Sequence, residues 1–292
     1  MNKLKKIGLT ALAGSLVAGS VSAAEMSVTG SAGMSYSGGD EKATTGAGWT
    51  MGDSVTFSAS GDVNDIGVTY SVELDGDAGQ SATAPIDSHS ITFDLGEAGT
   101  LIFAGHGGST AMSAVDDVMP TASEEPWDVV TGADASIIGG HSGNNSFNYS
   151  YAHDSGVTFT AAHVQSADAV TDVSYSDFGI SYTGVEGLTV GYAQGDVEAT
   201  TNTKSEHNTM YAKYAIGSIT VGIQTSENDR ESASDYESTG MGISYQVNDD
   251  LAVSYGQHTL EIVGGTDQES SAVSASYTMG SLAVSYTHLT LP

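Results

Sequence analysis

Hydrophobic and polar residues alternate along most of this 292-residue chain. In the first such run, from Met26 to Tyr36, every second residue is apolar or small, and the residues between are Ser, Thr or Gly. A period of two residues places the apolar side chains on one face of a β-strand. Similar runs recur to the end of the chain, and no segment has the 3.6-residue period of a long helix. The pattern predicts an all-β protein.

The predicted strands form hairpins. Short turns rich in Gly, Asn and Asp join them in pairs at residues 61–65, 96–99, 154–156, 184–187, 217–218, 248–250 and 280–281. The returning strands that begin at Leu188, Ile219, Leu251 and Leu282 resemble one another in sequence. Seven hairpins and the leading strand predict fifteen strands.

Longer polar connections alternate with the short turns. We expect them at residues 37–53, 75–88, 194–208, 225–236 and 257–270. The longest stretch without a sustained period is Gly105 to Asn145, which contains no Lys or Arg. A stretch of this length without secondary structure is uncommon in a compact domain unless it has a function. Its acidic residues are Asp116, Asp117, Glu124, Glu125, Asp128 and Asp134.

The N-terminus has the pattern of a secretory signal peptide. Lys3, Lys5 and Lys6 form a basic region, and Ile7 to Val21 is apolar and rich in small residues. Val21-Ser22-Ala23 fits the small-x-small cleavage rule, so residues 1–23 are expected to be removed. A membrane anchor helix is the other reading, but a spanning helix needs about 20 apolar residues. The mature domain is then residues 24–292, an exported protein.

The chain is strongly acidic, with 36 Asp and Glu against 7 Lys and Arg. After removal of the signal peptide the basic residues are Lys42, Lys204, Lys213 and Arg230. Binding nucleic acid needs clustered Lys and Arg, so nucleic acid is excluded as a partner and cations are favoured. The chain has no Cys, which excludes disulfides, thiol catalysis and Cys-based metal sites.

Three features favour a transmembrane antiparallel β-barrel over a soluble β-sandwich. Small residues, with few Lys or Glu, occupy the strand face opposite the apolar one. Short turns at one end and long connections at the other are the outer-membrane pattern. Tyrosines lie near strand ends, as in the aromatic girdles of membrane barrels: Tyr149, Tyr182, Tyr192, Tyr214, Tyr245, Tyr255, Tyr277 and Tyr286.

The strand count also bears on the end of the chain. An outer-membrane barrel closes with an even number of strands, so sixteen are expected and about fifteen are present. After Tyr286 the alternation fades, and the terminal Pro292 cannot donate to a β-ladder. We therefore expect the barrel to be truncated before its last strand.

On these features the chain resembles the general bacterial porins, most of all the alphaproteobacterial type. The resemblance rests on the signal peptide, the start Ala24-Glu-Met-Ser-Val-Thr-Gly-Ser, the fifteen strands and the long stretch after the fifth strand, Gly99-Thr-Leu-Ile-Phe-Ala-Gly105. It implies a homotrimer in the lipid of the Gram-negative outer membrane, a channel and not an enzyme. It also implies passive diffusion of small hydrophilic solutes and a third external loop folded into the lumen. The chain departs from the family by ending in Pro292 rather than an aromatic residue.

The resemblance makes the acidic stretch the expected pore constriction, with Asp116, Asp117, Glu124, Glu125 and Asp128 as its carboxylates. Many family members place an Arg cluster on the opposite wall. Here Lys213 is the only basic residue in a predicted strand, in the lumen-facing phase of Thr209 and Tyr211. We therefore expect a negative bore that prefers cations. Carboxylates also suit Ca²⁺, which takes oxygen ligands, and no other cofactor is expected.

Two other functions remain open from the sequence. An exported acidic β-rich surface protein or adhesin that binds calcium would have the same composition and no pore. An outer-membrane esterase would need a nucleophile, and His106-Gly-Gly108 is not accompanied by a G-x-S-x-G elbow. The eight His residues show no metal-binding spacing such as H-E-x-x-H. Trp127 is expected to pack the loop against the wall.

Overall fold

The computed structural model describes residues 25–37, 48–75, 86–116, 118–126, 143–165, 174–198, 204–231 and 233–290. These residues form fifteen β-strands and two 3₁₀ turns, η1 (Gly96–Ala98) and η2 (Ser113–Val115). The expectation of an all-β chain with fifteen strands is confirmed. No helix in this part of the chain has the length and apolar character needed to cross a membrane. The chain divides into two compact units, residues 1–108 and 109–292.

The first unit is an antiparallel meander in which each strand pairs with the next along the chain. Asn64 and Asp65, both with positive φ, make the tight turn between the second and third strands, as these residue types favour. Its strands are β1 (Glu25–Ser37), β2 (Gly48–Val63), β3 (Ile66–Asp75), β4 (Ile86–Asp94) and β5 (Thr100–His106).

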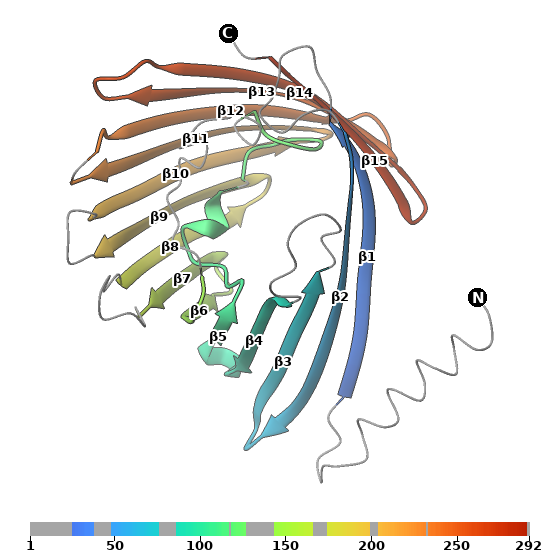
Figure 1. Cartoon of the computed structure of the whole chain (residues 1–292), viewed down its shortest axis with the longest axis vertical. Coiled ribbons are helices and arrows are strands. Elements are labelled where there is room, and N and C mark those ends of the chain that lie inside the picture. The colour runs from blue at the N-terminus through green and yellow to red at the C-terminus, as the bar shows by residue number, and fades with distance from the viewer. Residues whose placement is uncertain are drawn as a thin grey trace. The chain divides into compact units, whose positions relative to one another are not determined.

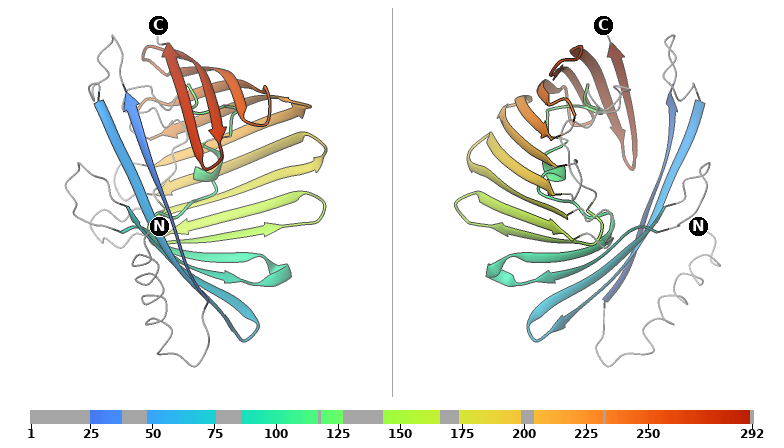
Figure 2. Two further views of the ribbon diagram at one scale, coloured as in Figure 1. Left: turned by 90° about the vertical axis from the view of Figure 1, so that its right-hand side faces the viewer. Right: turned by 60° about the vertical axis from the view of Figure 1, so that its left-hand side comes forward.

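The second unit continues the same pattern, with neighbouring strands paired antiparallel in sequence order (Figure 2). Its strands are β6 (Ser146–Ala152), β7 (Val157–Val164), β8 (Ser174–Val185), β9 (Leu188–Glu198), β10 (Ser205–Ile216), β11 (Ile219–Arg230), β12 (Tyr236–Gln246), β13 (Leu251–Ile262), β14 (Gln268–Met279) and β15 (Leu282–Thr290).

One face of the second unit is an exposed apolar surface. The register aligns Tyr214, Val221, Ile243, Tyr255 and Val273 on a single rung across β10 to β14. These side chains are between 41% and 54% exposed, although they are large and apolar. A contiguous apolar surface of this kind marks contact with a membrane or a partner. We call it the apolar face.

Tyrosines of the apolar face gather near the short turns. Tyr182, Tyr214, Tyr245 and Tyr277 lie one to three residues before the last residue of β8, β10, β12 and β14. Tyr214, Tyr245 and Tyr277 are 41%, 45% and 46% exposed. Four of the eight tyrosines predicted near strand ends therefore lie there. The prediction was wrong for the other four, which lie nearer the middle of β6, β9, β13 and β15: Tyr149, Tyr192, Tyr255 and Tyr286.

The opposite face, which we call the polar face, carries small and hydroxyl side chains. In the first unit one rung is Ser27, Ser58, Ser71, Ser90 and Ala104, and the hydroxyls of Ser58 and Ser71 lie 3.2 Å apart. In the second unit Thr209 and Ser226 are buried on this face, with their hydroxyl oxygens 2.7 Å apart. The two faces thus separate as the alternation predicts.

The predicted strand ends were wrong in several places. Strand β2 begins at Gly48, β11 runs to Arg230 and β13 to Ile262, so the predicted connections at 37–53, 225–236 and 257–270 are partly strand. Strand β15 continues past Tyr286 to Thr290, paired with β14. Backbone groups make the ladder, so pairing continues where the side chains cease to alternate. The sixteenth strand stays a prediction, and the signal peptide lies outside the described residues.

Candidate functional site

The long acidic stretch provides the candidate site. Its residues 109–116 and 118–126 cross the polar face of the second unit, and we call them the loop segment (Figure 1). The segment touches strands from β8 to β14 through the hydrogen bonds and close contacts given below. It therefore covers the side of the strands that carries the small and hydroxyl residues.

The loop segment begins with a capped turn. The Thr110 amide donates to Ser113 Oγ (2.7 Å), and the Ser113 amide donates to Thr110 Oγ1 (3.2 Å). This reciprocal pairing resembles a capping box and satisfies the amides of Thr110 and of Ser113, the first residue of η2. The turn continues into η2, a single 3₁₀ turn from Ser113 to Val115.

A buried carboxylate on β8 holds this turn. Asp177 is 5% exposed, and its Oδ2 accepts hydrogen bonds from the Met112 amide (2.8 Å) and the Tyr175 hydroxyl (3.0 Å). Charge-assisted hydrogen bonds of this kind are stronger than neutral ones. Asp177 thereby joins residues 65 positions apart in the sequence.

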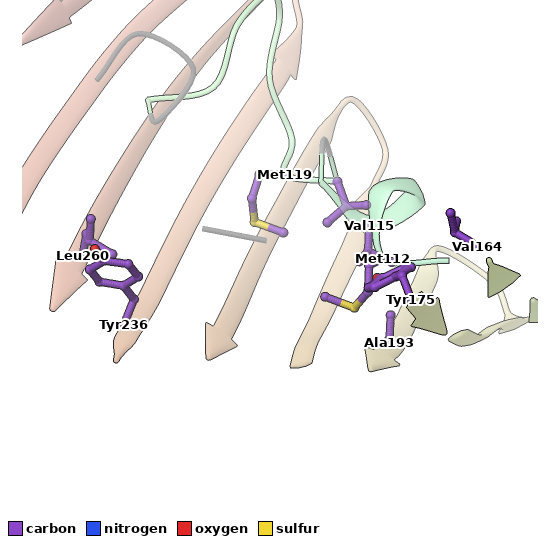
Figure 3. Packing of buried hydrophobic residues seen from close by; sticks show 9 residues of the cluster. Met112, Val115, Met119, Val164, Tyr175, Ala193, Tyr236 and Leu260 are labelled. Carbon is purple, nitrogen blue, oxygen red and sulfur yellow. The ribbon is translucent and has the colours of Figure 1, made fainter. Parts of the chain in front are cut away.

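Apolar contacts reinforce the same region. Met112 and Val115 of the loop segment pack with Tyr175 of β8 and Ala193 of β9, and all four are buried (Figure 3). Next to this cluster, Gln224 Nε2 of β11 donates to the Val115 carbonyl at 2.9 Å. The first half of the loop segment is thus attached to three strands.

The second half is attached through hydroxyl groups. The Ala122 amide donates to Ser254 Oγ of β13 at 2.8 Å. Thr121 Oγ1 lies 3.4 Å from Ser254 Oγ and 3.2 Å from Ser274 Oγ of β14, and it donates to the Glu124 carbonyl at 2.9 Å. Hydroxyl groups donate and accept, so this small network holds the turn after Pro120 against the strands.

The structure separates the predicted constriction carboxylates by environment. Glu124 is exposed and Asp116 is half-buried at the end of η2. Glu125 is only 3% exposed, and its Oε1 accepts a hydrogen bond from the Met119 amide at 3.1 Å. Glu125 therefore holds the loop segment together through an internal hydrogen bond and is not presented to solvent. Asp117, Trp127, Asp128 and Asp134 lie outside the described residues.

Two basic side chains lie on the polar face of the described strands in the second unit. Lys213 of β10 has its Nζ 5.9 Å from the centroid of the Tyr211 ring, on the side predicted from its phase. Arg230 was predicted in a loop, but it ends β11, with its guanidinium 4.0 Å over the Tyr236 ring. Arg230 also donates from Nε and Nη2 to the Ser234 carbonyl.

The described residues contain no group of three or more His, Asp and Glu side chains placed to hold a metal ion. A calcium site stays a prediction. His106 ends β5, and its Nδ1 is hydrogen-bonded to the Asp87 carbonyl.

Sequence reasoning missed the residues that attach the loop segment, chiefly Asp177, Gln224 and Ser254. One signal was available for Asp177, because it is a carboxylate in the phase of Tyr175 and Gly179, on the polar face of its strand. A charged residue in that phase needs a partner on the covered side of the sheet. The partner itself, a backbone amide 65 residues earlier, has no sequence signature.

Comparison with solved structures defines the class of protein. The chain resembles the anion-selective porin from Comamonas acidovorans, with a TM-score of 0.69 and 13% identity over 91% of this chain and 90% of that one. It also resembles a variant of Rhodobacter blastica porin, with a TM-score of 0.68 and 12% identity over 91% of this chain and 95% of that one. A third similar structure is the trimer form of OmpT from Vibrio cholerae, with a TM-score of 0.67 and 14% identity over 92% of this chain and 89% of that one. At these identities the likeness shows the fold, that of a transmembrane β-barrel.

The chain belongs to the Gram-negative porin family, which it matches over residues 8–290. No curated protein matches it by sequence. Family and fold together make it an outer-membrane channel protein, so the porin resemblance and the outer-membrane location are confirmed.

Proposed function

We propose that the chain forms a water-filled channel for passive diffusion of small hydrophilic solutes, with the loop segment as its constriction and with a preference for cations. The observation that carries the proposal is the placement of the loop segment across the polar face, attached to β8, β11, β13 and β14. A porin-type barrel turns one strand face to lipid and the other to its lumen. The apolar face is then the lipid face, and the loop segment narrows the lumen.

Charge supports the cation preference. On the loop segment, Glu124 is exposed and Asp116 is half-buried. On the polar face of the described strands in this unit, Lys213 and Arg230 are the basic residues, and the Arg230 guanidinium is stacked on Tyr236 and bonded to the Ser234 carbonyl. Fixed carboxylates at a narrow point lower the barrier for cations and raise it for anions.

The partners of the channel follow from the same fold, and we include them in the proposal. A V. cholerae porin of this fold is recorded as a trimer, which supports a homotrimer here. The exposed apolar rung supports contact with outer-membrane lipid.

The test is the reversal potential in a planar bilayer under a KCl gradient, for the native chain and two variants. Glu124→Gln removes a carboxylate of the loop segment. Glu97→Gln, in η1 between β4 and β5, removes an exposed carboxylate that is not part of that segment. We expect a cation-selective channel whose selectivity falls in Glu124→Gln and is unchanged in Glu97→Gln.

Each other outcome contradicts part of the proposal. An anion-selective potential would leave a channel but refute the electrostatic role of the loop segment. Equal selectivity in the two variants would place Glu124 away from the ion path. Folded protein without conductance would refute the channel itself.

A further inference from the structure

Three glycines of the second unit form one continuous row under the loop segment. The register pairs Gly222 of β11 with Gly242 of β12, and Gly242 with Gly256 of β13. Lys213 and Ala272 continue the row on either side. We call Gly222, Gly242 and Gly256 the glycine rung.

The loop segment lies against this rung through its two prolines. A methyl group on Gly222 would lie 2.6 Å from Pro120 Cδ and 3.1 Å from its Cγ. A methyl on Gly242 would lie 2.8 Å from the Pro120 carbonyl oxygen. A methyl on Gly256 would lie 2.8 Å from Pro126 Cγ and 2.9 Å from its Cδ. These distances are below carbon contact separations of about 3.5–4.0 Å, so no larger residue fits without moving the loop segment.

Close approach is the reason that these positions are glycine. None of the three has a positive φ, so the backbone conformation makes no demand for glycine there. Glycine within a strand weakens the strand and marks a site where another backbone comes near. Gly33 and Gly52 of the first unit provide the contrast, because a methyl group on either would meet no atom within 4 Å.

The prolines suit this contact. Each ring fixes the backbone φ and is rigid, so it makes a defined spacer between the loop segment and the strands. Pro120 and Pro126 are both buried, and the anchors at Ala122 and Thr121 lie between them. The loop segment thus rests on the wall at two rigid points with its hydrogen bonds in between.

We propose that the glycine rung sets the distance between the loop segment and the strands, and thereby the aperture of the channel. The three glycines are positioning residues, which act on permeation through Pro120 and Pro126. The inference about the aperture rests on the proposed function. The inference that the glycine rung holds the loop segment at a set distance from the strands, which we call the seat of the loop segment, rests on the contacts alone.

The experiment uses a cysteine pair to report how closely the loop segment lies against the strands, and single-channel conductance to report the aperture of the channel. The chain has no native Cys, so Thr121→Cys with Ser274→Cys gives a clean reporter, and the two hydroxyl oxygens lie 3.2 Å apart. Into this background go Gly222→Ala, Gly242→Ala or Gly256→Ala, with Gly52→Ala as the matched control. Disulfide yield and single-channel conductance are measured for each.

We expect Gly222→Ala and Gly256→Ala to reduce the disulfide yield several-fold and to lower conductance, because the loop segment moves away from the wall. Gly52→Ala should change neither. Removing the ring that causes the clash should restore both readouts, so Pro120→Ala is combined with Gly222→Ala, and Pro126→Ala with Gly256→Ala. Pro120→Ala should not rescue Gly242→Ala, because there the methyl meets the carbonyl oxygen of residue 120, which the substitution retains.

The outcomes separate the two proposals. Native disulfide yield in all three glycine variants would overturn the seat. A reduced disulfide yield with unchanged conductance would support the contact between the glycine rung and the loop segment, but it would refute the role of the loop segment as the constriction. If Pro120→Ala restored the disulfide yield of Gly242→Ala as fully as that of Gly222→Ala, the contacts assigned to the two glycines would be wrong. If Gly222→Ala does not fold, restoration of folding by Pro120→Ala supports the seat, and failure of that rescue contradicts it.

Discussion

The extended strands of the second unit carry a row of like charges whose removal should stabilise the protein. Glu227 of β11, Glu237 of β12 and Glu261 of β13 lie directly opposite one another in register. All three are exposed. Side chains opposite each other on antiparallel strands have Cβ atoms about 4.5–5.5 Å apart, and like charges there are destabilising. Glu237 is the central member and has a carboxylate on both sides.

The magnitude follows from this geometry. Two unit charges about 5 Å apart in water repel by about 0.8 kcal/mol. Measured cross-strand pair energies of roughly 0.2–1 kcal/mol agree with that value. Glu237→Gln removes two such repulsions, so the free energy of unfolding should rise by roughly 0.4–2 kcal/mol at low ionic strength. The screening length falls to about 3 Å at 1 M salt, so most of the gain should then disappear.

The assay is the urea midpoint of the refolded protein in detergent micelles, at low salt and at about 1 M NaCl. Glu269→Gln is the matched control, because Glu269 of β14 is exposed on the same face but lies opposite Thr259. Glu237→Gln should be more stable than Glu269→Gln at low salt and equal to it at high salt. Equal midpoints at low salt would refute the reasoning, as would a gain that persists at high salt.

Two further predictions concern the polar face. Asp177→Ala removes the carboxylate that accepts from the Met112 amide and the Tyr175 hydroxyl, so it should lower the free energy of unfolding by about 3 kcal/mol in the same urea assay. Asp177→Asn should lower it by less, and equal effects of the two variants would show that the charge has no role. Lys213→Gln removes a cation from the polar face and should shift the reversal potential further toward cation selectivity. Lys204→Gln, a change just before β10, should leave the reversal potential unchanged. Equal reversal potentials in the two variants would place Lys213 away from the ion path.

The alternation was sufficient to predict which way each strand faces. The even-numbered residues Met210, Ala212 and Tyr214 were expected on the apolar face of β10, and Lys213 on the other, as the register places them. The rule works because the side-chain period of a strand is two residues, so one well-placed apolar run fixes the phase of the whole strand. Hairpin turns then fix the pairing of neighbours.

Strand ends and loop contacts were not predictable in the same way. The acidic residue Glu227 was assigned to a connection, yet it belongs to β11 and pairs with Glu237 of β12, because the ladder uses backbone groups. Glu125 was expected at the constriction but is buried against the Met119 amide. Such contacts depend on the path of the chain in space, and hydrophobic period carries no information about that path.

The sign of ion selectivity must come from particular side chains, because the fold does not determine it. The anion-selective porin from C. acidovorans has this fold, with a TM-score of 0.69 and 13% identity. Fixed charges on the polar face and on the loop that crosses it can supply that sign. Here Arg230 is stacked on Tyr236 and bonded to the Ser234 carbonyl, which leaves Lys213 as the basic side chain nearest the glycine rung among the described residues. If the proposed function holds, the exposed Glu124 of the loop segment and a polar face with little compensating positive charge together favour cations.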